Sequence, residues 1–167
     1  MPIGIACAIG IDGMDGSKEI MCSMYGDKML ERGMASFVYD GPGQGECPVN
    51  GLYVTKDNHM EAAQAIYDWL IQHPHIDKDR LVIFGISFGS FFGMQAAAQL
   101  GDKVKGAALS FVCHEPGCHT IFNMAAPTFK LRFMFMAGYD DEDEFDEFIS
   151  EFSLLPILDQ VACPILI

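Results

Sequence analysis

The sequence predicts an α/β fold, with a mostly parallel sheet covered by helices on both faces. Three observations support this class. Apolar runs of strand length alternate along the chain with segments of helical periodicity. Half of the residues are hydrophobic and the mean hydropathy is +0.20, as expected where strands are buried on both faces. The length of 167 residues fits one domain, 1–167.

The first strand, loop and helix are predicted at the amino end. Residues 2–9 form an apolar, Ile-rich run that indicates a buried strand, and the glycine-rich segment 10–16 indicates a loop. Ser17 is a suitable N-cap for a helix over 18–32, because its hydroxyl can accept a hydrogen bond from the first turn. Gly33 is placed to end this helix.

A second strand and helix follow. The strand is predicted over 35–39, a turn-rich segment over 40–46, and a helix over 58–72 with Asp57 as its cap. Its apolar positions recur at helical spacing and should face the sheet: Met60, Ala63, Tyr67 and Leu70.

The alternation continues to about residue 109 and is then interrupted. A short strand over 81–84 precedes a helix that ends at Gly101, and a further strand is expected over 105–109. The Phe- and Met-rich segment 110–141 breaks the pattern and is predicted to be a lid-like insertion. The remaining expected elements are a helix over 142–152 and a strand over 163–167.

Charge and hydropathy exclude several classes of partner. The formal net charge is −13, from 23 acidic and 10 basic residues, so no nucleic-acid partner is expected. No apolar stretch reaches the length of a membrane span, and the amino end lacks the basic region of a signal peptide. The acidic run 140–147 is interpreted as a solvated surface, since it lacks the ligand spacing of a calcium loop.

The six cysteines do not show the spacing of a disulfide framework. They are interpreted as reduced thiols in a cytoplasmic enzyme. The pairs 113–114 and 118–119 bring Cys and His together, but their spacing fits none of the common zinc patterns. No metal site and no cofactor are therefore expected, and this segment is interpreted as a loop that lines a pocket.

The strongest chemical motif is Gly85-Ile-Ser-Phe-Gly89, which follows an apolar strand and opens a helix. A serine on such a sharp turn is held in strained backbone with its hydroxyl clear of the sheet, as a nucleophile requires. Ser87 is therefore the candidate catalytic residue. The alternative is that Ser87 only caps an ordinary crossover helix.

A nucleophilic serine needs donors for the negative charge that develops on the substrate oxygen. One donor would be the backbone N–H of Phe88, at the amino end of a helix. The others are expected in the loop after the first strand, at the backbone N–H groups of Gly13 and Met14. A phosphate-binding loop is the competing interpretation, but no Gly-Lys-Ser/Thr follows at the required place.

Four segments together resemble the FrsA-like branch of the α/β-hydrolases, which includes esterases, a dihydroxypseudooxynicotine hydrolase and fungal polyketide-shortening hydrolases. They are Asp12-Gly-Met-Asp-Gly-Ser-Lys-Glu19, Arg32-Gly-Met-Ala35, Asp40-Gly-Pro-Gly-Gln-Gly-Glu46 and Gly85-Ile-Ser-Phe-Gly-Ser90. The resemblance covers about residues 2–109 well and implies a partial α/β-hydrolase fold.

This resemblance also implies roles for individual residues. Ser87 would be the nucleophile, and residues 40–45 a structural turn near the pocket rather than a source of the catalytic acid. The segment 122–139 would belong to a lid, with pocket residues among Asp15, Phe129, Phe133 and Met136. The alternative for each apolar member of this set is that it packs the core.

A complete triad also needs a histidine and an acid, and the resemblance places both beyond Ile167. The chain is thus expected to be a fragment that is inactive by itself. A compact arrangement of Ser87, His119 and Glu115 is a less favoured alternative, and the histidines before Ser87 are interpreted as surface or helix-end residues.

The predicted function is cleavage of an ester or a ketone-activated C–C bond through an acyl-enzyme on Ser87. The partner would be a small-molecule acyl or ketone substrate, with a homo-oligomer left open and no membrane involved. A peptidase of the same fold and a non-catalytic binding protein are the alternatives.

Overall fold

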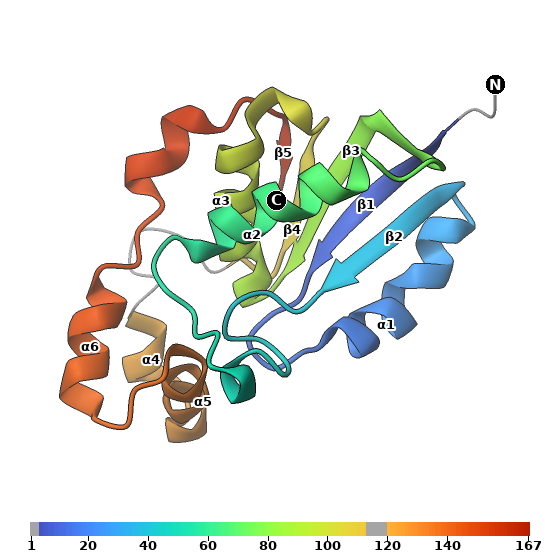
Figure 1. The fold of residues 1–167 in the computed structure, drawn as a ribbon. Helices are drawn as coiled ribbons and strands as arrows, with labels where there is room; N and C mark the ends of the chain where they lie inside the picture. Colours follow the sequence, from blue (N-terminus) through green and yellow to red (C-terminus); the bar gives the residue numbers. More distant parts are fainter. Residues whose placement is uncertain (1–3, 113–119) are drawn as a thin grey trace.

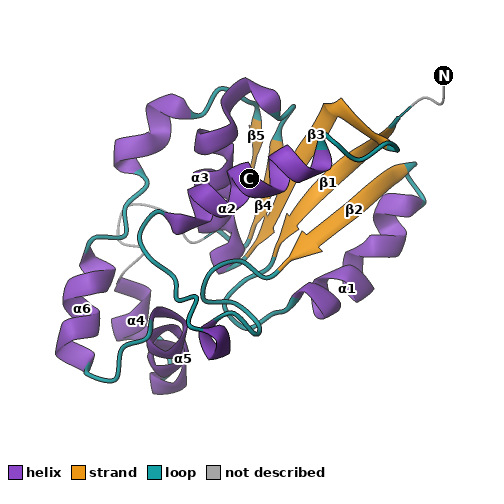
Figure 2. Cartoon of the chain, viewed as in Figure 1, coloured by secondary structure: helices purple, strands orange, loops and turns teal. Residues whose placement is uncertain are grey.

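The computed structural model describes residues 4–112 and 120–167, which form a layered α/β fold around a parallel sheet (Figures 1 and 2). The sheet has five strands in the order β2-β1-β3-β4-β5, and every described pair is parallel. Its strands are β1 (Ile5–Ile11), β2 (Met34–Tyr39), β3 (Ile76–Ile86), β4 (Ala107–Ser110) and β5 (Ile165–Leu166). The predicted α/β class with a parallel sheet is confirmed.

Six described α-helices connect or flank these strands. They are α1 (Lys18–Leu30), α2 (Asn58–Leu70), α3 (Phe88–Leu100), α4 (Ile121–Met124), α5 (Pro127–Ala137) and α6 (Glu142–Ser150). Short 3₁₀ helices occupy Pro48–Asn50, Gly101–Lys103 and Leu155–Gln160.

The strand order fixes where a site can form. The chain passes from β1 to β2 in one direction across the sheet, and from β3 to β4 in the opposite direction. Because parallel crossovers are right-handed, α1 covers one face, whereas α2 and α3 cover the other (Figure 1). The loops that follow β1 and β3 therefore separate at a topological switch point, where α/β proteins bind their ligands.

Several local signals act as predicted. The hydroxyl of Ser17 accepts a hydrogen bond from the Ile20 N–H at 3.5 Å and caps α1. Gly101 ends α3 with a φ of 56°, a conformation that suits glycine. Asp57 differs from the prediction: it lies at the N-cap position of α2 but makes no side-chain capping bond, and the Asn58 N–H instead donates to the Thr55 hydroxyl at 3.2 Å.

Strand boundaries differ from the prediction, most of all at the start of β3. β1 extends to Ile11 because its last residues pair with Tyr39 on one side and Gly85 on the other. β3 starts at Ile76 rather than 81, since Ile76 pairs with Ile5 of β1. The charged residues 77–80 hid this start, because they lack the apolar pattern of a buried strand.

Phenylalanine rings hold α3, α5 and α6 together beyond the sheet. Phe133 of α5 is fully buried and lies 4.6 Å from Phe88, between ring centroids, and 5.0 Å from Phe122. It also contacts Phe145 and Phe152. Phe122 and Phe133 of the predicted insertion are thus packed into the core, although α4 and α5 lie beyond the carboxyl ends of the strands (Figure 1).

No helix in the described ranges combines the length and apolarity that a membrane span requires.

Candidate active site

Ser87 occupies the sharp turn between β3 and α3. Its φ of 55° and ψ of −129° lie in a region that side-chain-bearing residues rarely adopt. The turn is fixed on one side by the Ser87 N–H, which donates to the Ser110 carbonyl of β4 at 2.9 Å. The residue is exposed, whereas Phe88, Gly89 and Ser90 after it are buried. This is the geometry of an elbow that presents one hydroxyl to solvent.

The glycines of the motif are required by close backbone approaches. A Cβ on Gly85 would collide with the Gly89 carbonyl. A Cβ on Gly89 would collide with the carbonyls of Ile11 and Asp12, at the end of β1. The start of α3 and the end of β1 are thus in direct contact, which brings the predicted donor loop to the elbow.

Gly13 lies against the nucleophile. A Cβ added to Gly13 would lie 2.8 Å from the Ser87 Cβ and 3.2 Å from its Oγ. The Gly13 N–H donates to the Asp12 carboxylate at 2.7 Å, and burial raises the pKa of that carboxyl group. The second predicted donor, Met14, is buried. The structure therefore places the Gly13–Met14 loop beside Ser87.

Phe88, the third predicted donor, is the first residue of α3. Its backbone N–H belongs to the first turn, where N–H groups have no intrahelical acceptor. Its ring is buried and lies 5.3 Å from Phe92 and 4.6 Å from Phe133, between centroids. The packed side chain fixes the backbone next to Ser87.

Two residues of the turn over 40–45 bind neighbouring segments of the site: Asp40 binds the start of α1, and Gln44 binds the loop after β1. Asp40 accepts hydrogen bonds from the backbone and side-chain nitrogens of Lys18, at 2.7 and 2.6 Å, and so joins β2 to the start of α1. Gln44 is buried and donates to the carbonyls of Asp12 and Gly13 at 2.6 and 3.0 Å. Gln44 was not among the residues predicted from the sequence. The available signal was its place between Gly43 and Gly45 in the segment Asp40–Glu46, one of the four that carry the family resemblance.

His59 was predicted to be a surface or helix-end residue; it does lie at the start of α2, but it is not on the surface. His59 is fully buried, and its ring stacks on Phe92 at 3.6 Å between centroids. Its Nε2 lies 2.9 Å from the Pro42 carbonyl, and burial lowers its pKa to about 3. A neutral imidazole whose Nε2–H donates to Pro42 fits this environment. The His59 side chain thus packs against the turn over 40–45. It precedes Ser87 in the chain.

The predicted pocket residues are spread over different environments. Phe133 and Met136 are both buried. Phe133 contacts Phe88 of α3 and Phe145 of α6, whereas Met136 lies against Gly43 of the turn after β2. Phe129 is half-buried and contacts Phe122 at 5.5 Å between centroids. Asp15 is exposed and forms an ion pair with Arg132 of α5, which connects the donor loop to this helix.

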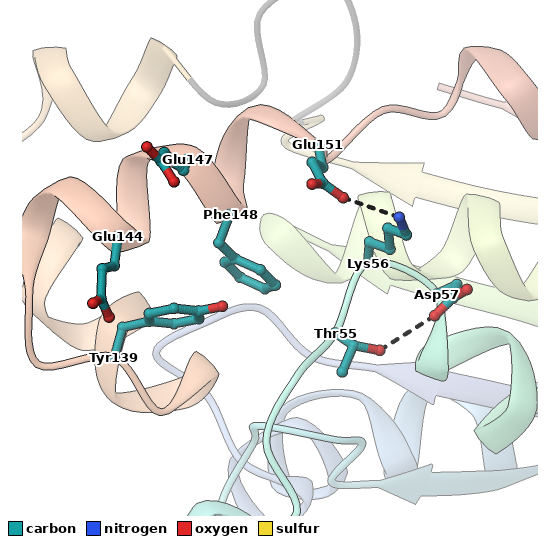
Figure 3. A pocket seen from close by; sticks show the side chains of 8 residues that line it. All are labelled: Thr55, Lys56, Asp57, Tyr139, Glu144, Glu147, Phe148 and Glu151. Atoms are coloured by element: carbon teal, nitrogen blue, oxygen red, sulfur yellow. Dashed lines mark hydrogen bonds and ion pairs between the residues drawn. The ribbon is translucent and has the colours of Figure 1, made fainter.

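A surface pocket of about 720 Å³ lies between α6 and the segment 55–57 (Figure 3). The rings of Tyr139 and Phe148 form part of its wall, and Lys56 is paired with Glu151 at 2.9 Å. The other charged residues around it are Asp57, Glu144 and Glu147. No residue of the elbow or the donor loop lines this pocket, so it is separate from the Ser87 site.

The candidates for a triad inside the chain, Glu115 and His119, lie outside the described residues, as do His114 and the neighbouring cysteines. Within the described ranges, no group of three His, Cys, Asp or Glu side chains is arranged to hold a metal ion.

Solved structures share this architecture. The 2,6-dihydroxy-pseudo-oxynicotine hydrolase matches with a TM-score of 0.87 and 23% identity, over 99% of this chain and 45% of that one. A puromycin-hydrolyzing peptidase of Mycobacterium tuberculosis matches with a TM-score of 0.72 and 20% identity, over 98% of this chain and 25% of that one. At these identities the likeness establishes the fold, and the predicted α/β-hydrolase fold is confirmed.

Curated proteins with related sequences are named hydrolases. Hydrolase LUC6 of Fusarium sp is 32% identical over 98 residues, which cover 56% of this chain and 23% of that protein. The 20-hydroxy-prefusarin hydrolase FUS2 of Gibberella moniliformis is 31% identical over 101 residues, which cover 58% and 24%. The chain thus spans about a quarter of the length of these relatives. The model of the prolyl oligopeptidase family matches residues 25–167, and the chain therefore belongs to this family of α/β-hydrolases.

Proposed function

We propose that this chain carries the nucleophile and the oxyanion-binding loop of a serine hydrolase that forms an acyl-enzyme on Ser87. The observation that carries the proposal is the exposed Ser87, held at a φ of 55° with Gly13 against its side chain. Strained backbone persists only where the surroundings enforce it, and such strain concentrates at functional sites.

The chemistry follows from this placement. A general base takes the proton of the Ser87 hydroxyl as its oxygen attacks a carbonyl carbon. The oxyanion that forms is stabilised by the backbone N–H groups of Phe88 and Met14, because the Gly13 N–H donates to the Asp12 carboxylate. Collapse of this intermediate expels the leaving group, and water then releases the acyl group from Ser87. The base and its acid partner are expected outside the described residues.

The favoured substrates are an ester or a ketone-activated C–C bond, which the resemblance to the FrsA-like branch implies. The curated relatives are named hydrolases, which supports hydrolysis as the class of reaction. Membership of the prolyl oligopeptidase family supports a peptidase as the second candidate. The two differ in the bond that is cleaved. Parallel assays with p-nitrophenyl butyrate and an aminoacyl p-nitroanilide separate them, because a peptidase hydrolyses the anilide efficiently.

The nucleophile is tested by labelling the native protein that contains this sequence with a fluorophosphonate probe. We expect one label per chain, on the peptide containing Ser87, and its complete loss in Ser87→Ala. Ser110→Ala is the matched control, because Ser110 is also exposed, at the end of the neighbouring strand β4, and should label normally. Undiminished labelling of Ser87→Ala, or no labelling of the native protein, would refute the proposal.

A further inference from the structure

The side chain of Gln44 connects two backbone segments near the nucleophile. Gln44 is 2% exposed, so its amide has no access to bulk water. Its Oε1 accepts a hydrogen bond from the Gly41 N–H at 2.9 Å. Its Nε2 donates to the carbonyls of Asp12 and Gly13 at 2.6 and 3.0 Å. One amide thereby joins the turn after β2 to the loop after β1.

These two carbonyls belong to the peptide groups that matter most for the proposed chemistry. A peptide group joins the C=O of one residue to the N–H of the next and is planar. The Asp12 carbonyl therefore shares a plane with the Gly13 N–H, and the Gly13 carbonyl with the Met14 N–H. A bond that fixes the direction of each carbonyl also fixes the opposite direction of each N–H.

The same bonds also affect how strongly these N–H groups donate. A hydrogen bond accepted by a carbonyl polarises its peptide group, and chained hydrogen bonds strengthen one another in a low-dielectric interior. A Gln44 amide on both carbonyls thus polarises both peptide groups. The Gly13 N–H donates to the Asp12 carboxylate, so the Met14 N–H is the oxyanion donor that gains from this polarisation. Preorganised donors of this kind are the main source of oxyanion stabilisation.

The turn that carries Gln44 is itself held rigidly. The Gln44 N–H donates to the Gly41 carbonyl at 2.9 Å. A Cβ on Gly41 would lie 2.8 Å from the Nδ1 of the buried His59, whose Nε2 lies 2.9 Å from the Pro42 carbonyl. The ring of His59 in turn stacks on Phe92 of α3, the helix that begins at the elbow.

From this geometry we propose that Gln44 is a positioning residue that orients and polarises the oxyanion-binding peptide groups of the Asp12–Met14 loop. This inference rests on the proposed function of Ser87. Gln44 does not touch the substrate, and it acts through the two carbonyls that it binds. A purely structural role would require only that the turn and the loop be held together.

The first variant is Gln44→Glu in the native protein. An ionised carboxylate has no proton to donate, and it repels the carbonyls of Asp12 and Gly13. We expect kcat for p-nitrophenyl acetate at pH 8 to fall by about 10- to 100-fold with KM little changed, because an oxyanion forms only in the transition state. The ratio of the variant's kcat to that of the wild type, taken at each pH, should rise as pH falls. The reason is that a protonated carboxyl group can again donate one hydrogen bond.

The matched control is Gln95→Glu on α3. Gln95 is also 2% exposed, and its Nε2 donates to a backbone carbonyl, that of Lys56, away from the donor loop. This substitution buries the same carboxylate and should lower stability to a similar degree. It should leave kcat per folded molecule, and its pH profile relative to the wild type, unchanged.

Gln44→Met is the second variant and covers the case in which Gln44→Glu does not fold. It keeps the length of the side chain and introduces no charge, so it should lower kcat without any recovery at low pH. Unchanged kcat in both Gln44 variants, or an equal loss in Gln95→Glu, would overturn the positioning role while Ser87→Ala still abolished labelling. Persistent labelling of Ser87→Ala would instead overturn the proposed function.

Discussion

Replacing Phe133 by alanine tests whether α5 is part of the core or a separable lid. The Phe133 side chain is 0% exposed and contacts four other phenylalanine rings, those of Phe88, Phe122, Phe145 and Phe152. Truncating a fully buried phenylalanine removes its transfer free energy and leaves a cavity, at a cost of about 3–5 kcal/mol. Domains are stable by only about 5–15 kcal/mol, so the loss should be large.

The control for this substitution lies two residues away on the same helix. Phe135 is 57% exposed, so Phe135→Ala should change the free energy of unfolding by less than about 1 kcal/mol. Urea denaturation of the native protein, followed by far-ultraviolet circular dichroism, gives both values. Equal and small losses in the two variants would refute the packing argument and favour a lid that opens independently of the core.

Two further predictions concern the site and its support. Gly13→Ala should slow fluorophosphonate labelling of Ser87 by about 10-fold or more, because the new Cβ would lie 2.8 Å from the Ser87 Cβ. The control is Gly26→Ala in α1, where a Cβ would meet only the Cys22 sulfur at 3.5 Å. This variant should label at the wild-type rate. His59 has its pKa lowered to about 3 by burial, whereas an unfolded histidine titrates near 6.5, so the unfolded chain binds the proton first. The free energy of unfolding should therefore decrease as pH falls from about 6.5 toward 3, by up to about 1.4 kcal/mol per pH unit, and His59→Gln should remove this contribution between pH 6.5 and 5.5. Urea midpoints of both proteins across that interval measure it, and parallel pH dependences would contradict the buried neutral imidazole.

Local sequence signals predicted much of the sheet and its helices. The apolar runs located β2 and the carboxyl-terminal half of β3, and the capping hydroxyl of Ser17 located the start of α1. The motif around Ser87 was recognisable because an elbow needs small residues at fixed offsets from the serine. These features depend on neighbours within a few residues, so the sequence contains them directly.

Other features required knowledge of contacts between distant segments. The first residue of β3, Ile76, pairs with Ile5 of β1, whereas the charged residues 77–80 lie at a register shift before the next pair, Cys7 with Leu81. His59 lies at the start of a predicted helix, and its burial follows from the stacking of its ring on Phe92 of α3 and its contact with the Pro42 carbonyl. Neither contact is visible in the local sequence around His59.

The sequence by itself determined the α/β class, the parallel sheet and the turn that carries Ser87, because hydrophobic periodicity and glycine spacing are local properties. The tertiary structure alone decided that Gly13 lies against Ser87 and that Gln44 reaches the carbonyls of the donor loop. It also placed Phe133 among four other phenylalanine rings in the core. These outcomes depend on the strand order, which brings segments more than 30 residues apart in the chain together at the carboxyl ends of the strands.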